Sequence, residues 1–431
     1  MSMMVISTGN DHMFNPSTAV RPENCSPQVW SSPPSKARLP RSVIFQIPHR
    51  LAMASLPTKN ISTTALVVEK PGAPFLLENV ILDEVRSQEL LVEIKYAGVC
   101  HTDIVVQEGK MPIGSFPAVL GHEGAGVVLR LGDGLKQSGL AVGDRVLLGY
   151  CSCMACPACN DGRKGACNNI AMINFAGARG PEDSPLRLAN GTSIRGAFFG
   201  QSSFSKLAIV DYRAVVKYDG PVEDLSFLAP LGCGYMTGAA TVLNVLKPKS
   251  SQSVAIFGLG AVGLCALMAA KSLPVSEIIA VDILDSRLEI ATKIGATKTI
   301  NGKQHDSIEA AIRQLLPAGV DYVVDTTGLT KMINEGIKAL NHGGTFAVVG
   351  TPRPGELAQF DALDMLVHCK KIIGITGGYC DPQSFIPQLV QMFRSGKFPI
   401  DTLSKTYPPS KIEQAMQDMK SGKVIKPILS W

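Results

Sequence analysis

One stretch of the 431-residue chain carries side chains that could bind a metal. Cys100 and His122 offer a thiolate and an imidazole, the ligands that a borderline-soft ion such as Zn²⁺ prefers. The hydroxyl of Thr102 and the carboxylates of Asp103 and Glu123 lie beside them in the sequence. These residue types suit metal-assisted chemistry, although a buried thiol and a satisfied core histidine would leave the same pattern. The rest of the chain has to decide between the two interpretations.

A second group of cysteines has a regular, short spacing. The pattern is Cys-x2-Cys-x2-Cys-x7-Cys, formed by Cys153, Cys156, Cys159 and Cys167. Four thiolates this close can complete a tetrahedral structural zinc site and leave no position open for substrate. Redox-active or unligated thiols are the alternatives. With Cys151, five of the eleven cysteines fall within seventeen residues, which is not the distribution of disulfides in a large secreted protein.

The third motif is glycine-rich and lies between a β-rich run and a helical one. Residues 258–263 read G-L-G-A-V-G. Gly258 allows a tight turn, Gly260 lets a pyrophosphate approach the backbone at the helix N-terminus, and Gly263 lets the helix pack closely on the strand. Val262 lies inside this motif. The pattern therefore predicts a dinucleotide-binding loop rather than an ordinary glycine-rich core turn.

An acidic residue follows at the distance expected for a ribose contact. Asp282 stands twenty-two residues after Gly260, at the end of the next predicted strand. Its carboxylate should accept hydrogen bonds from an adenosine ribose and repel a 2′-phosphate, which favours NAD over NADP. Arg287 is placed to reach the same ribose, or else belongs with Asp285 to a solvated helix start.

A zinc ion that takes part in chemistry needs three protein ligands and one open position. Cys100 and His122 supply two of these ligands. Cys233 lies between small residues just before the nucleotide-binding half. Such a cysteine is more often core than ligand when it stands alone, but beside a metal half-site and a dinucleotide motif we predict that it is the third ligand.

These motifs need two kinds of scaffold. Residues 61–234 predict a compact, mostly antiparallel β-barrel, with a loop-like, cysteine-bearing lobe over residues 151–170. The strands expected there are Thr64–Val68, Leu90–Tyr96, Gly126–Leu131 and Asp144–Leu148.

Residues 235–375 predict an α/β fold in which strands and helices alternate, which means a doubly wound parallel sheet. Its six expected strands are Ser253–Phe257, Glu277–Val281, Lys298–Ile300, Asp321–Asp325, Thr345–Val349 and Lys371–Ile375. Helical periodicity is found over Ser286–Ile294 and Ser307–Leu316. Residues 376–431, with a helix over Ser384–Arg394 and a strand over Val424–Leu429, are expected to return to the first domain.

Charge and hydropathy exclude several classes of partner. The 41 basic and 36 acidic residues give a net charge of +5, too small at this length to indicate nucleic acid or an anionic membrane surface. The apolar run Val254–Ala270 contains three glycines and is shorter than the roughly 20 residues that cross a bilayer. Residues 1–52 are rich in Ser, Pro and Asn and are predicted to be disordered. Their first twenty residues contain no Arg or Lys, which favours a cytoplasmic protein over a mitochondrial one.

Taken together, these motifs carry a family resemblance. The chain from about Met53 to Trp431 resembles the zinc-dependent medium-chain alcohol dehydrogenases, and within them the aryl or benzyl alcohol dehydrogenases. The resemblance rests on the two zinc motifs, the glycine motif, Gly98–Asp103, Gly121–Gly124, Gly232–Gly234, and, for the aryl group, Phe198–Phe204 and Phe385–Leu389. It implies a GroES-like barrel, a Rossmann coenzyme domain, NAD, two zinc ions per chain and a homodimer or homotetramer.

The resemblance also implies roles around a catalytic zinc. Cys100, His122 and Cys233 would be its ligands. Glu123 would be close enough to act as an alternate ligand during exchange of water or substrate. Asp103 would orient the His122 ring.

Further roles concern the substrate and the cofactor. Thr102 would hydrogen-bond the substrate oxygen and pass its proton towards the cofactor ribose. His101 and Lys426 would meet the pyrophosphate. The nicotinamide would be held by Thr237, Val349 and Gly350. Val105 stands where the family often has a histidine, so the last step of the proton to solvent departs from the family pattern.

The expected reaction is hydride transfer between a small aryl primary alcohol or aldehyde and NAD. Its apolar lining is expected from Tyr150, Phe175, Phe198 and Phe199, unless these rings belong to the core. Two alternatives stay open. One is a reductase of a heterocyclic aldehyde or lactone, or a glutathione-adduct dehydrogenase, on the same site, and the other is an inactive zinc- and nucleotide-binding protein.

Overall fold

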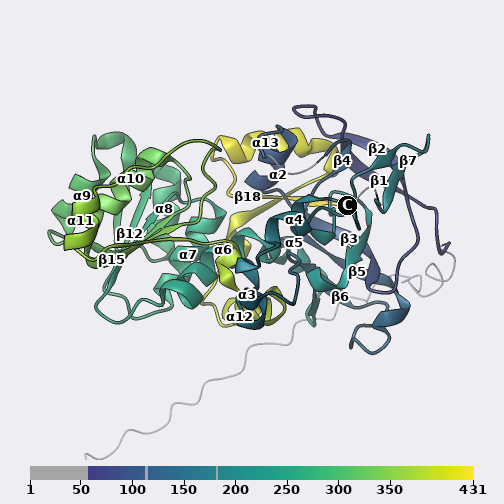
Figure 1. Cartoon of the computed structure of the whole chain (residues 1–431), viewed down its shortest axis with the longest axis horizontal. Helices are drawn as coiled ribbons and strands as arrows, with labels where there is room; N and C mark the ends of the chain where they lie inside the picture. The colour runs from purple at the N-terminus through teal and green to yellow at the C-terminus, as the bar shows by residue number, and fades with distance from the viewer. Residues whose placement is uncertain (1–56, 112–114, 181–182) are drawn as a thin grey trace, which may run out of the picture. The chain divides into compact units, whose positions relative to one another are not determined.

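The computed structural model describes residues 57–111, 115–180 and 183–431 (Figure 1). The disorder predicted for residues 1–52 lies outside these ranges. Within the described ranges, no single helix has both the length and the apolar composition to cross a membrane. One bent pair of helices, Leu225–Gly232 with Gly234–Leu246, meets this requirement when the two are taken together, by length and composition only.

Two mostly antiparallel sheets are built from the strands that flank the parallel sheet in sequence. In the described residues one runs β4-β1-β2-β7-β8 and the other β10-β6-β5-β3-β18-β17, with β9 also paired to β3. Their bounds are β1 Ile61–Val68, β2 Leu76–Leu82, β3 Glu89–Gly98, β4 Ala118–Val119, β5 Gly124–Leu131, β6 Arg145–Leu148, β7 Leu186–Leu188, β8 Ser193–Ile194, β9 Leu207–Asp211, β10 Val215–Tyr218, β17 Ser404–Tyr407 and β18 Lys426–Ser430. All four strands expected in this part are confirmed, as β1, β3, β5 and β6.

The nucleotide-binding half contains a parallel sheet in the order β13-β12-β11-β14-β15-β16. Its strands are β11 Ser253–Phe257, β12 Glu277–Asp282, β13 Lys298–Asn301, β14 Val320–Asp325, β15 Leu340–Val348 and β16 Lys371–Gly374. Its helices are α7 Ala261–Lys271, α8 Asp285–Ile294, α9 Ile308–Leu315, α10 Thr330–Ala339 and α11 Ala362–Val367. The six expected strands are confirmed, and the predicted doubly wound α/β fold with them.

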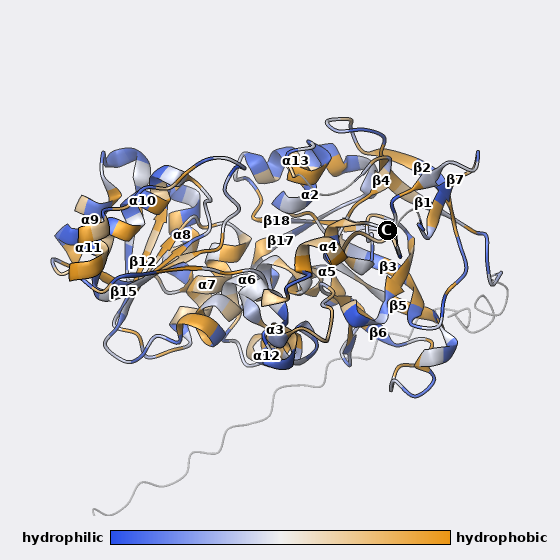
Figure 2. Cartoon of the chain, viewed as in Figure 1, coloured by the Kyte–Doolittle hydropathy of each residue, from blue (hydrophilic) through white to orange (hydrophobic). Residues whose placement is uncertain are grey.

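Burial explains why these segments form a layered sheet. Every residue of β11 is buried, as expected for a central parallel strand covered on both faces. α9 buries Ile308, Ala311 and Ile312, which is the i, i+3, i+4 stripe of a helix with one apolar face. Figure 2 shows the result, with apolar strands inside and hydrophilic residues along α9 and α10.

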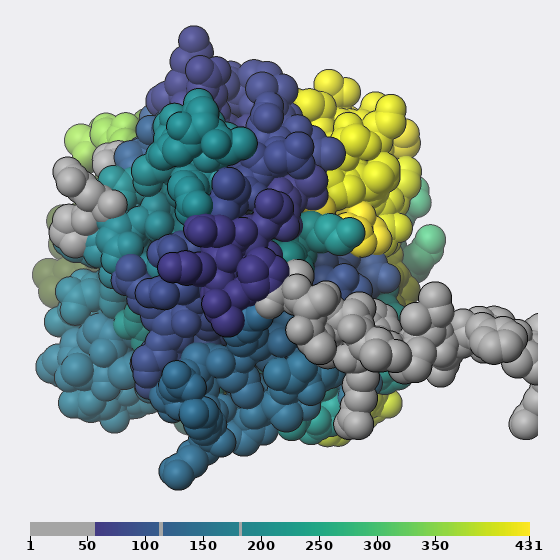
Figure 3. All heavy atoms as spheres, turned by 90° about the vertical axis from the view of Figure 1, so that its right-hand side faces the viewer, coloured from purple at the N-terminus to yellow at the C-terminus, as the bar shows by residue number. Residues whose placement is uncertain are grey.

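The end of the chain returns to the first strands. β18 pairs antiparallel with β3, so that Ile428 lies opposite Gly98, and the backbone N–H of Trp431 donates to Lys95. Figure 3 shows these C-terminal residues, in yellow, against the purple residues of the early strands. The remaining α-helices are α2 His101–Gln107, α3 Pro157–Asn160, α4 Ile170–Phe175, α5 Leu225–Leu228, α6 Gly234–Ala240, α12 Pro382–Arg394 and α13 Ile412–Lys420. The domain boundaries at 61–234, 235–375 and 376–431 stay predictions.

Candidate functional site

Four ligating side chains from three parts of the chain converge on one point. The ligand atoms of Cys100, His122, Glu123 and Cys233 all lie within 4.8 Å of one another. Cys100 directly precedes α2, His122 and Glu123 directly precede β5, and Cys233 directly precedes α6. The structure therefore brings together the three ligands predicted for a catalytic zinc, with a carboxylate beside them.

The imidazole of His122 is held in one orientation. Its ring is buried, and Nδ1 lies 2.9 Å from Oδ1 of Asp103. Asp103 also accepts hydrogen bonds from the backbone N–H groups of Gly121, at 3.0 Å, and Cys100, at 3.1 Å. The opposite ring nitrogen, Nε2, is buried and has no hydrogen-bond partner in the part of the chain that the structure describes. A buried ring nitrogen without a partner is what a metal ion would satisfy.

The electrostatics of this cluster favour a cation. A hydrogen bond between Cys100 and Cys233 lowers the pKa of Cys100 well below its ordinary value and raises that of Cys233. Burial lowers the pKa of His122, but the charges of Asp103 and Cys100 outweigh it, so that this pKa is raised well above its ordinary value. Surroundings that hold a proton on a buried imidazole also attract a metal ion. Sulfur, nitrogen and carboxylate donors are those of zinc sites.

Glu123 is held by an ion pair within the same cluster. The Nζ of Lys426 lies 2.9 Å from one carboxylate oxygen of Glu123 and 2.8 Å from the other, and it also donates to the carbonyl of Val99 at 3.2 Å. Burial raises the pKa of Glu123 to about 7, despite the opposing charge of Lys426. Burial alone would lower the pKa of Lys426, but the Glu123 carboxylate raises it on balance. The structure thus places Lys426 against Glu123, and its predicted contact with a pyrophosphate stays a prediction.

The other predicted residues of this stretch lie on the first turns of α2. Thr102 Oγ1 is 3.8 Å from Cys100 Sγ, beside the cluster. His101 is exposed at the first position of the helix, and Val105 is half-buried one turn later. The hydroxyl is therefore at the metal cluster, while the imidazole of His101 is free to face a ligand outside it.

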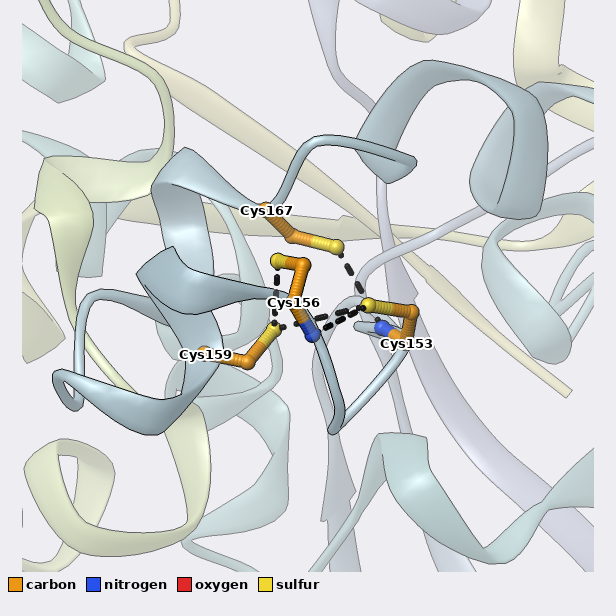
Figure 4. Close-up of side chains that lie close together, drawn as sticks. All are labelled: Cys153, Cys156, Cys159 and Cys167. Atoms are coloured by element: carbon orange, nitrogen blue, oxygen red, sulfur yellow. Dashed lines mark hydrogen bonds between the residues drawn. The ribbon is translucent and has the colours of Figure 1, made fainter.

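The four spaced cysteines form a second cluster (Figure 4). The Sγ atoms of Cys153 and Cys159 are 3.9 Å apart, and those of Cys156 and Cys159 are 3.5 Å apart. A tetrahedral zinc with Zn–S bonds of about 2.3 Å requires sulfur atoms about 3.8 Å apart. The sulfur of Cys153 accepts from the backbone N–H of Cys156, and that of Cys167 from the N–H of Cys153, each at 3.3 Å. The predicted structural zinc site fits these residues.

The glycine motif has the three roles that the sequence suggested. Gly258 has φ +84°, in the left-handed region, and begins the turn between β11 and α7. A Cβ on Gly263 would lie 1.9 Å from the carbonyl oxygen of Gly258, so only glycine permits this approach of helix to strand. A Cβ on Gly260 would meet nothing within 4 Å. That open space at the N-terminus of α7 is where a pyrophosphate would lie.

Asp282 is tied to this loop. One carboxylate oxygen accepts from the backbone N–H of Leu259 at 2.7 Å, and the other from Ile283 at 2.7 Å and Leu284 at 3.0 Å. Arg287 Nη1 lies 3.5 Å from the Leu259-bound oxygen. The carboxylate is therefore fixed beside the glycine motif, where a ribose hydroxyl could still donate to it.

The residues predicted to hold the nicotinamide lie on two separate elements. Thr237 is half-buried within α6. Val349 and Gly350 follow β15, and both of their N–H groups donate to the carbonyl of Asp325, at 3.0 and 2.9 Å. α6 packs closely against α7 at Gly238. A Cβ on this glycine would lie 2.0 Å from the carbonyl oxygen of Val262, so the absence of a side chain allows the approach. Contacts of these residues with a nicotinamide stay a prediction.

Two of the four predicted aromatic side chains lie against His122, and a third packs on those two. The ring of Phe199 lies 4.5 Å from the imidazole and that of Phe198 5.6 Å, while Phe175 contacts both phenylalanines. Phe199 has φ +53°, an uncommon backbone conformation for such a side chain. Tyr150 is instead buried against Cys380, to whose carbonyl it donates a hydrogen bond.

The sequence analysis missed Gln201 as a residue of the site. Its buried amide accepts from the N–H of Gly124 at 3.0 Å and donates to the carbonyls of His122, at 3.0 Å, and Gly149, at 2.9 Å. Gln201 thus holds the backbone on which His122 is carried. The signal available in the sequence was a polar side chain following two phenylalanines in Phe198–Phe204.

Two family models and a number of known proteins are similar to this chain. The family described as alcohol dehydrogenase GroES-like domain matches residues 86–220, and the one described as zinc-binding dehydrogenase matches residues 261–395. A geraniol dehydrogenase of Castellaniella defragrans is 36% identical over 86% of this chain and 98% of its own length. Alcohol dehydrogenase 1 of Trifolium repens is 30% identical over 86% of this chain and 97% of its own length.

Two solved structures are similar to this chain in both sequence and fold. A benzyl alcohol dehydrogenase from Acinetobacter calcoaceticus is 40% identical, with a TM-score of 0.80 over 86% of this chain and 99% of that one. An alcohol dehydrogenase zinc-binding domain protein from Burkholderia ambifaria is 44% identical, with a TM-score of 0.81 over 86% of this chain and 98% of that one.

Proposed function

Because the chain belongs to the zinc-dependent medium-chain alcohol dehydrogenases, an enzyme family that acts on CH–OH donors, we propose that it oxidises aryl or benzyl-type primary alcohols with NAD, or reduces the aldehydes. The observation that carries the substrate class is the aromatic cluster of Phe175, Phe198 and Phe199 beside the imidazole of His122. Flat aromatic surfaces next to the reacting centre suit a benzylic substrate. The 40% identity to a benzyl alcohol dehydrogenase supports the same class.

The reaction converts an alcohol and NAD⁺ into an aldehyde, NADH and a proton. When bound, zinc supplies Lewis acidity and the nicotinamide accepts the hydride. Cys100, His122 and Cys233 would hold the metal. Thr102 would accept the proton of the substrate hydroxyl at Oγ1 and pass it on, because its hydroxyl lies beside Cys100.

Other residues position these groups. Asp103 keeps His122 Nε2 directed into the cluster, and Gln201 fixes the backbone that carries this histidine. Gly260 leaves room for the pyrophosphate, and the negative charge of Asp282 favours a free ribose 2′-hydroxyl over a 2′-phosphate.

A second candidate substrate is an allylic isoprenoid alcohol. The relative that is 36% identical over 86% of the chain is a geraniol dehydrogenase. An allylic alcohol, like a benzylic one, has an sp² carbon next to the carbinol, so the same rings could cover either. Substrate profiling decides between them.

The test is a comparison of kcat/KM for benzyl alcohol, geraniol and ethanol in the zinc-loaded enzyme with NAD. We expect benzyl alcohol to be preferred over ethanol by at least about tenfold, and Phe199→Ala to remove this preference by about 1–3 kcal/mol in transition-state free energy. Phe227→Ala is the matched control, because Phe227 packs on Phe393 outside the aromatic cluster.

Preference for geraniol would favour the second candidate. Turnover of no aromatic alcohol or aldehyde would refute the proposal and leave the reductase or the inactive binding protein as the interpretation.

We further propose a cytoplasmic homo-oligomer. None of the ten cysteines in the described ranges forms a disulfide, as expected in a reducing compartment. No residue of α11 is buried, although most of this helix is apolar, and β16, which follows it in the chain, is the last strand in the order of its sheet. A second copy can pair with such an edge around a two-fold axis and cover the helix in the same contact.

A further inference from the structure

A cavity of about 570 Å³ lies away from all of the residues discussed so far. Its walls come from the last turns of α7 and α8, which contact each other (Figure 1), and from the segment between α12 and β17. The lining residues are Met268, Lys271, Ser272, Ile290, Lys293, Ile294, Gly396, Lys397, Pro399 and Thr402. Its volume is in the range of small-molecule sites.

The rim of this cavity is positively charged. Lys271, Lys293 and Lys397 come from three different segments, and no acidic residue of the described chain lines the cavity. Among the described residues, none of these three ammonium groups forms an ion pair or a side-chain hydrogen bond. Three positive charges around one hollow, without an acid, attract an anion.

The floor of the cavity is apolar. Met268 is buried, and Ile290, Ile294 and Pro399 are partly buried around it. The stem of Lys271 crosses Gly295, since a Cβ on that glycine would lie 2.8 Å from Lys271 Cδ. The methylene groups of Lys271 therefore pack on the apolar floor, while its ammonium group stays at the rim of the cavity.

Neither the coenzyme nor the helix ends account for this arrangement. The glycine motif is at the other end of α7, eleven residues and therefore about 16 Å away. Lysines in the last turn of a helix offset its dipole, and Lys338 does so on α10 without lining the cavity. The dipole accounts for Lys271 and Lys293 separately, but not for Lys397, which lies beyond the end of α12, nor for the meeting of all three over an apolar floor.

We propose that this cavity binds an amphipathic anion, namely a carboxylate with an apolar chain of medium length. The carboxylate lies among the three lysines, and the chain covers Met268 and the two isoleucines. Binding is reversible and involves no chemistry.

The test is calorimetric titration of sodium decanoate, below its aggregation concentration, into the zinc-loaded full-length protein. We expect saturable binding that is at least tenfold weaker in the double variant Lys271→Gln/Lys293→Gln. Lys338→Gln, which removes an equivalent charge from the end of α10, should bind decanoate like the unmodified protein. In crystals soaked with 10-bromodecanoate, the anomalous signal of bromine should lie next to Met268.

Four results would overturn the proposal. Equal binding in the double variant would assign decanoate to another place, the metal cluster included. Inorganic phosphate binding as tightly as decanoate would show that the apolar floor contributes nothing. Binding only to anionic vesicles would indicate a membrane surface instead, and a bromine signal elsewhere in the crystal would exclude the cavity directly.

Discussion

The position of His122 Nε2 depends on a carboxylate that is not itself one of the four ligating side chains of the metal cluster. Asp103 binds His122 Nδ1 and two backbone N–H groups, so a single side chain fixes both the imidazole and the start of α2. The sequence predicted this role only through a family resemblance. Of the four predicted aromatic residues, Phe198 and Phe199 lie beside His122 and Phe175 packs on both of them, whereas Tyr150 is buried against Cys380.

Zinc content should separate the two clusters. We expect two zinc ions per chain, one for each group of ligands. Cys100→Ala should retain one zinc and the melting temperature of the parent. Cys156→Ala should lose the structural zinc and melt at a lower temperature, because the lobe has little other core. Elemental analysis measures the zinc content and thermal melting measures the stability. Cys369→Ala is the control, because Cys369 is exposed and belongs to neither cluster. Two zinc ions retained in both cluster variants would contradict the assignment.

Cofactor choice should depend on the charge of Asp282. Asp282→Gly should relax the preference for NAD over NADP by at least about tenfold, or about 1.4 kcal/mol, because the charge that repels a 2′-phosphate is gone. Asp282→Asn keeps an acceptor for the backbone N–H of Leu259 and tests the charge alone. The ratio of kcat/KM for the two cofactors is the measurement, and an unchanged ratio in both variants would refute the role of Asp282.

At the scale of elements, two glycines of the 258–263 motif serve different purposes. Gly263 permits a contact between α7 and the turn after β11, whereas Gly260 borders open space. The periodicity predicted the helices and strands around this loop within a few residues. β15 begins at Leu340 rather than Thr345, and seven strands were not predicted: β2, β4, β7, β8, β9, β10 and β17. These strands are short or partly exposed, and their pairing depends on partners elsewhere in the chain.

The two glycines should therefore respond differently to alanine. Gly263→Ala should lower the free energy of unfolding by about 1–3 kcal/mol, because its Cβ would overlap the carbonyl of Gly258. Gly260→Ala should change stability by less than about 0.5 kcal/mol but weaken NAD binding, because its Cβ fills the space left for the pyrophosphate. Chemical denaturation and NAD titration measure the two effects. Tight NAD binding by Gly260→Ala would contradict the assigned position of the pyrophosphate.

At the scale of the whole molecule, exposed apolar side chains gather near one edge of the parallel sheet. Leu357 is 82% exposed, Leu366 75% and Leu363 66%, all in the segment of chain that leads into the edge strand β16. Several large apolar side chains exposed on one short segment are typical of an interface. The place of this segment, at the end of a sheet with an unpaired outer edge, favours a second copy of the chain as the partner.

Charge introduced on this face should therefore dissociate the oligomer. Leu363→Glu/Leu366→Glu should shift the mass measured by light scattering towards that of one chain, because paired copies would bury the new carboxylates. Leu77→Glu is the control, since Leu77 is 51% exposed on β2, outside this face. An unchanged mass for the double variant, or a monomeric parent, would contradict the proposal.

The sequence by itself determined the features that depend on short spacing. The four cysteines of the lobe lie within fifteen residues, and the glycine motif, its helix and Asp282 belong to one β-α-β unit, so neighbouring residues fix their geometry. Tertiary structure alone decided which distant residues meet. Pairing of β18 with β3 brings Lys426 to Glu123, and the fold carries Gln201 to the backbone of His122. Such contacts follow from strand register and shared burial, which local propensity does not encode.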